Sequence, residues 1–133
     1  MAKKQLDVEE AKPKRNTRNS RQRGIRYEQA ICKELRELGF SAITTRFASK
    51  MMDDSKVDII DENGELPLLQ LKRQQNYPNY IAIRDSCPIK DKEFVILWNQ
   101  QKGTEKTFRS VGEMAIMSKA FFYELIKHYY GKV

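Results

Sequence analysis

Histidine and cysteine are scarce in this chain of 133 residues, which contains one histidine and two cysteines. Cys32 and Cys87 are far apart and lack the spacing of metal ligands, so we expect two free thiols in a reducing cytosol. Cys32 lies in a helical pattern and is expected to be buried like a small hydrophobic residue. His128 lies beside two tyrosines, and we expect it in packing or at the surface, not as a base or ligand.

Long apolar runs are also missing, and no hydrophobic signal segment stands at the start. A transmembrane helix needs about 20 consecutive apolar residues, so none is expected. We therefore expect a soluble cytoplasmic protein. The length suits one modest domain and not two.

Positive charge is in excess, with 25 Lys and Arg against 18 Asp and Glu and a net charge of +7. The excess is concentrated near the start, where large apolar residues are almost absent. We therefore predict a basic N-terminal tail over residues 1–23, disordered when unbound, and a single folded domain over 24–133. Basic tails bind polyanions by releasing counterions, which favours nucleic acid as the partner. A purely solubilising tail is the alternative.

In the rest of the chain, strand patterns are grouped centrally, with helical patterns towards the two ends. Apolar spacing predicts a helix over 24–38, ended by Gly39. Residues 76–88 fit either a short helix starting at Pro78 or irregular structure. A turn is expected over 100–103. A last amphipathic helix is expected after the capping residue Ser118. Strands are predicted over 40–47, 56–61, 67–73, 93–99 and 106–111. This order predicts an α+β fold, with a sheet covered by helices.

Polar residues interrupt the two apolar strands of a predicted hairpin. Asp58 lies in the first, and Gln70 and Lys72 lie in the second, where residues two apart share a face. A carboxylate and an amide oxygen are suitable ligands for Mg²⁺ or Mn²⁺, and Lys72 can orient the attacking water and offset developing charge. Glu28 of the first helix can add a further ligand. Arg46 and Ser49 have the character of phosphate clamps.

Each residue taken alone has a simpler explanation. Glu28 fits an exposed helix charge, and Gln70 and Lys72 fit the solvent face of an edge strand. The order and spacing of all four residues favour the site.

The pattern resembles the PD-(D/E)xK nuclease superfamily, and Arg26-Tyr27-Glu28 and Arg46-Phe47-Ala48-Ser49 make it most similar to the Holliday junction resolvase branch. The resemblance covers about residues 24–98. It implies a restriction-endonuclease-like mixed sheet flanked by helices, with catalytic roles for Glu28, Asp58 and Lys72 and a serine near the scissile phosphate. It also implies a homodimer that cuts four-way DNA junctions in the cytoplasm of a bacterium or a phage-infected host cell. The DNA contacts expected are Arg23, Arg26, Arg46, Ser49, Lys50 and Arg73.

Gln70 departs from the family, which has Asp or Glu at this position. Either Gln70 binds metal through its amide oxygen, with Asp53, Asp54 or Asp61 restoring charge, or catalysis is lost. Three functions therefore stay open: a junction-resolving endonuclease, a nuclease of the same fold with another DNA-processing role, and a non-catalytic nucleic-acid-binding protein.

Overall fold

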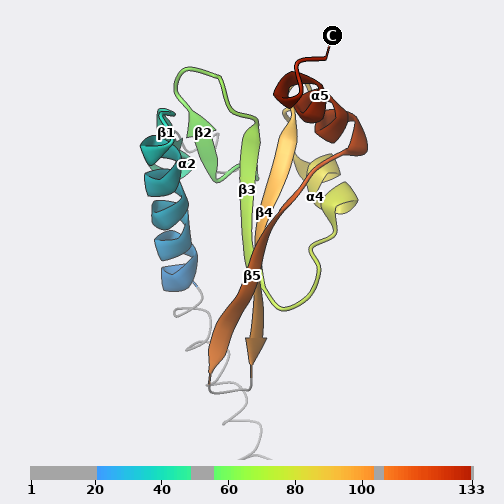
Figure 1. Ribbon diagram of the computed structural model, residues 1–133. Helices are drawn as coiled ribbons and strands as arrows, with labels where there is room; N and C mark the ends of the chain where they lie inside the picture. The colour runs from blue at the N-terminus through green and yellow to red at the C-terminus, as the bar shows by residue number, and fades with distance from the viewer. Residues whose placement is uncertain (1–20, 49–55, 104–106, 133) are drawn as a thin grey trace, which may run out of the picture.

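Five strands form one mixed sheet with helices on both faces in the computed structural model, which describes residues 21–48, 56–103 and 107–132 (Figure 1). The expected α+β fold is thereby confirmed. In chain order the elements are a first helix (residues 21–37), β1 (Ala42–Thr44), α2 (Thr45–Ala48), β2 (Ile59–Asp61), β3 (Leu68–Gln74), α4 (Tyr80–Ser86), β4 (Phe94–Gly103), β5 (Phe108–Ile116) and α5 (Lys119–Tyr129).

The strands lie in the order β1-β2-β3-β4-β5. β3 and β4 run parallel and pair along the whole of β3, and the other neighbours are antiparallel. β2 and β3 are matched through a single residue pair, Ile59 with Leu69. The expected hairpin is therefore present, but its two strands diverge soon after they meet.

Apolar clusters cover both faces of the sheet. On one face, Leu69 and Leu71 pack with Tyr27 and Ile31 of the first helix. On the other face, Leu68 packs in a cluster with Phe94 and Ile96 of β4, against which Tyr80 and Ile83 of α4 lie. Side chains alternate along a strand, so Gln70 and Lys72 share the α4 face with Leu68.

The helix ends follow local chemistry. Gly39 ends the first helix in the left-handed region, at φ +102°, while the Phe40 N–H bonds the Leu35 carbonyl. The Ser118 side chain accepts from the Phe121 N–H and caps α5 as predicted. The first helix already includes residues 21–23, which we had assigned to the tail.

The prediction of a strand over 40–47 is largely wrong. β1 ends at Thr44, and the chain turns at once into α2. Thr45 explains the turn, because its N–H bonds the Asp58 carbonyl and its buried hydroxyl bonds the Val57 carbonyl at 2.7 Å.

The prediction of a turn over 100–103 is also wrong, because β4 continues to Gly103. β5 likewise runs on to Ile116, beyond the strand predicted over 106–111. Asn99 and Gln101 are buried there, with the Gln101 amide donating to the Asn99 side-chain oxygen at 2.7 Å. The ambiguous segment 76–88 contains a helix, α4, which is capped by Asn79.

Both cysteines are free and Cys32 is buried, as the sequence suggested, and Cys87 is buried as well. Burial raises the pKa of the Cys32 thiol. His128 is exposed on α5. The apolar stripe of α5 is less buried than a core helix requires, since Phe122, Leu125 and Tyr129 are exposed. Within the described residues, no helix is both long and apolar enough to cross a membrane.

Candidate active site

Asp58 fills the gap that opens where β2 and β3 diverge. Its backbone N–H bonds the Leu69 carbonyl at 2.8 Å, and its Oδ2 accepts the Leu71 N–H at 2.8 Å. The carboxylate therefore lies against the backbone of Gln70 and Leu71, and it replaces the ladder partner that β2 does not supply to Leu71. This places Asp58 next to β3, as the sequence predicted.

Burial gives the Asp58 carboxyl unusual electrostatics. Loss of hydration raises its pKa from 3.8 to about 6, and the charge of Glu28 adds to the increase. The hydrogen bond from Leu71 and the charges of Lys72 and Arg46 act in the opposite direction. Glu28, Arg46 and Lys72 are thus all close enough to Asp58 to change its ionisation.

Gln70 and Lys72 occupy the α4 face of β3, in register with Ile96 and Trp98 of β4. Gln70 is only 8% exposed, and its side-chain Oε1 is fully buried with no hydrogen-bond partner in the described part of the chain. An unpaired buried oxygen costs about 1–3 kcal/mol, so it is a position that favours a cation or a donor. Lys72 is half-buried two residues further along. β3 is an inner strand of the sheet, with β4 paired along one edge and β2 paired at Leu69 on the other, so neither side chain lies on a terminal strand.

Glu28 and Arg46 form a bidentate ion pair, which the sequence did not reveal. Arg46 donates from Nε to Oε1 of Glu28 at 3.0 Å and from Nη2 to Oε2 at 3.1 Å. Glu28 is 5% exposed, so it is not the exposed helix charge that would be its ordinary explanation. Arg46 holds this buried carboxylate in place, and its guanidinium faces Glu28 where we had expected a phosphate.

The other expected DNA contacts are more scattered. Arg26 and Arg73 are exposed, and Arg23 lies over the Phe108 ring at 5.8 Å from its centroid. Ser49 and Lys50 lie outside the described residues.

Asp61, the one proposed substitute acid among the described residues, is engaged elsewhere. Both oxygens of Asp61 accept backbone N–H groups, from Asn63 at 3.0 Å and from Glu65 at 3.1 Å, so Asp61 organises the turn after β2. Asp53 and Asp54 lie outside the described residues. The described part of the chain holds no group of three or more His, Cys, Asp or Glu that could bind a metal. Any cation here would rely on Asp58, Glu28 and the amide oxygen of Gln70.

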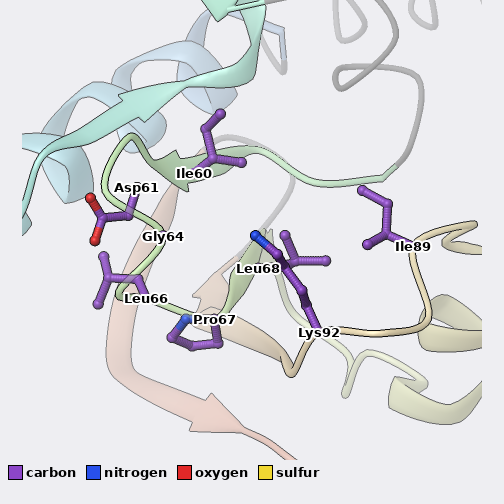
Figure 2. A pocket seen from close by; sticks show the side chains of 8 residues that line it. All are labelled: Ile60, Asp61, Gly64, Leu66, Pro67, Leu68, Ile89 and Lys92. Carbon is purple, nitrogen blue, oxygen red and sulfur yellow. The ribbon is translucent and has the colours of Figure 1, made fainter.

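A separate depression of about 220 Å³ lies near this turn. Figure 2 shows Asp61 and Gly64 on one side of it and Ile89 and Lys92 on the other, with Pro67 below. Asp58, Gln70 and Lys72 do not line it. We therefore place the candidate site at the divergence of β2 and β3 and not in this depression.

Tyr77 is an aromatic residue that sequence reasoning missed. It lies in the loop after β3, is 64% exposed, and meets the buried Trp98 ring edge-on. The signal was present as Asn76-Tyr77-Pro78-Asn79, a tyrosine within turn-forming residues directly after the polar strand.

Comparison with protein-family models, curated proteins and solved structures finds no match. The function is therefore inferred from the site and from the sequence resemblance.

Proposed function

We propose that this protein is a divalent-metal-dependent endonuclease that hydrolyses phosphodiester bonds in branched DNA, with four-way junctions as its main substrate. The observation that carries the proposal is the buried Oε1 of Gln70, which has no hydrogen-bond partner among the described residues. Gln70 precedes Leu71, whose N–H bonds the Asp58 carboxylate, and it shares a strand face with Lys72. Mg²⁺ and Mn²⁺ prefer such oxygen ligands.

Asp58, Gln70 and Glu28, the three residues with acceptor oxygens, would have different roles. Asp58 and Gln70 would hold the metal, and Glu28 would add negative charge from the first helix. When bound, the metal polarises a phosphoryl oxygen and acidifies water. Lys72 can orient that water and stabilise negative charge on the phosphate. Arg46 positions Glu28 through its Nε and Nη2 groups.

The choice of junctions and of a homodimer comes from the resemblance to the resolvase branch. Exposed apolar side chains give the dimer some support. Val111 and Met114 of β5 and Phe122, Leu125 and Tyr129 of α5 are exposed, and a second copy of the chain would cover them.

A non-catalytic DNA-binding protein is the second candidate. It is favoured by the amide at Gln70 and by Arg46, which engages both oxygens of Glu28. Such a protein would bind DNA equally well with metal or with chelator.

Cleavage of a labelled four-way junction, compared with a linear duplex of the same sequence, tests both candidates. We expect paired nicks in the junction with Mg²⁺ or Mn²⁺, none with chelator, loss in Lys72→Ala and retention in Lys92→Ala, an exposed control. Tight binding without cleavage would support the second candidate. Equal cleavage of the duplex would indicate a nuclease with another repair or processing role.

A further inference from the structure

Tyr77 is held in place by a tightly bonded loop. Trp98 Nε1 donates to the Gln74 carbonyl at 2.9 Å, and the Gln74 side chain donates to the Asn76 carbonyl at 2.9 Å. Pro78, the next residue, is fully buried, and Asn79 caps α4. The loop therefore presents an ordered aromatic ring to solvent.

This ring lies on the same side of the sheet as the candidate site. Trp98 is in register with Lys72 on the adjacent parallel strand, so the two side chains share a face. Tyr77 meets Trp98 with ring centroids 5.9 Å apart and ring planes at 85°. Because Trp98 is buried and Tyr77 is mostly exposed, the contact fixes Tyr77 and leaves much of its ring uncovered.

We infer that Tyr77 is a stacking platform for an unpaired nucleobase of the DNA strand whose phosphate lies at Lys72. The inference depends on the proposed function, and it narrows the substrate to DNA with an unstacked base beside the cut, as at a branch point. A tyrosine ring stacks on any base, and each such contact contributes about 1–3 kcal/mol. Bases inside a perfect duplex are already stacked and do not reach the ring.

The test is equilibrium binding in chelator, so that no cleavage is needed. The probes are a labelled single-stranded oligonucleotide, a four-way junction and a perfect duplex. Tyr77→Ala is expected to weaken binding of the single strand and the junction about 5- to 150-fold, which is the stacking energy above converted at about 1.4 kcal/mol per tenfold. Duplex binding is expected to stay within about twofold, since it does not use the stack.

Variants separate stacking from loss of structure. Tyr77→Phe keeps the ring and should bind like the wild type, whereas Tyr77→Leu keeps apolar contact with Trp98 and should bind like Tyr77→Ala. Tyr123→Ala on α5 removes another exposed aromatic and should have no effect. Equal binding by wild type, Tyr77→Ala and Tyr77→Leu overturns the inference, and so does an equal loss on the duplex.

The outcome is distinguishable from that of the nuclease assay. If Tyr77→Ala selectively loses binding to the single strand and the junction, and the wild type cleaves no DNA, the stacking site is supported and the nuclease is rejected. If the wild type cleaves the junction and Tyr77→Ala binds DNA as the wild type does, the nuclease is supported and the stacking site is rejected.

Discussion

Replacing Asp58 with asparagine should stabilise the metal-free protein. At about 1.4 kcal/mol for each unit of pKa, the increase from 3.8 to about 6 corresponds to about 3 kcal/mol of unfavourable free energy for the ionised carboxylate. Asparagine retains an oxygen that can accept the Leu71 N–H, and it carries no charge. Because Asp58 is not completely buried, we expect a gain of about 1–3 kcal/mol at pH 7.5.

The stability difference between the wild type and Asp58→Asn should change with pH in a defined direction. Between pH 3.8 and about 6 the unfolded chain has lost the Asp58 proton while the folded chain retains it. The wild type therefore loses stability relative to Asp58→Asn as pH rises through this interval, and the difference is constant above it. Below pH 3.8 the two proteins should be about equally stable.

Urea unfolding in chelator at several pH values measures this difference. Asp85→Asn is a suitable control, because Asp85 is an exposed aspartate on α4. An Asp58→Asn protein that is less stable than the wild type at pH 7.5 would refute the reasoning, and would show that the Leu71 hydrogen bond outweighs the cost of burial.

Three further changes test other parts of the structure. Gln70→Glu adds a buried carboxylate at the residue before Leu71, whose N–H bonds Asp58, so it should lower the melting temperature in chelator and tighten Mg²⁺ binding measured by calorimetry; an unchanged metal affinity would remove Gln70 from the ligand set. Deleting residues 1–20 should weaken DNA binding and reduce the slope of log Kd against log salt; an equal slope would mean that the tail does not contact DNA. Phe94→Ala removes a side chain that is 1% exposed in the α4-face cluster, and should cost about 3–5 kcal/mol in urea unfolding; a loss below 1 kcal/mol would contradict the packing described.

Local signals explain which elements could be predicted. Gly39 and Ser118 act on backbone groups within a few residues, so the sequence alone located both helix ends. β4 was predicted too short because the polar residues 100–103 end in a glycine, which is typical of a turn. Pairing with β5 and the bond between Asn99 and Gln101 make them part of the strand, and these contacts are not local.

In the candidate site, too, local patterns were predictable and contacts between distant residues were not. The period of two places Gln70 and Lys72 on one face, and the sequence was sufficient for this. The pairing of Glu28 with Arg46 joins residues 18 positions apart across two elements, so no periodicity predicts it. The stripe of α5 was recognised as amphipathic, but a pattern does not tell what covers it. Tyr77 was missed because an exposed aromatic becomes informative only when its neighbours are known.

The single residue pair between β2 and β3 divides the sheet into two parts of unequal strength. β3, β4 and β5 share long ladders, whereas β1 and β2 are tied to them mainly through Ile59, Leu69 and the bonds of Asp58. Amide hydrogens of Ile60 should therefore exchange with solvent faster than those of Ile96. Residues from both sides of this seam make up the candidate site, so any ligand that bridges Asp58 and Gln70 would also fasten the two parts of the sheet together.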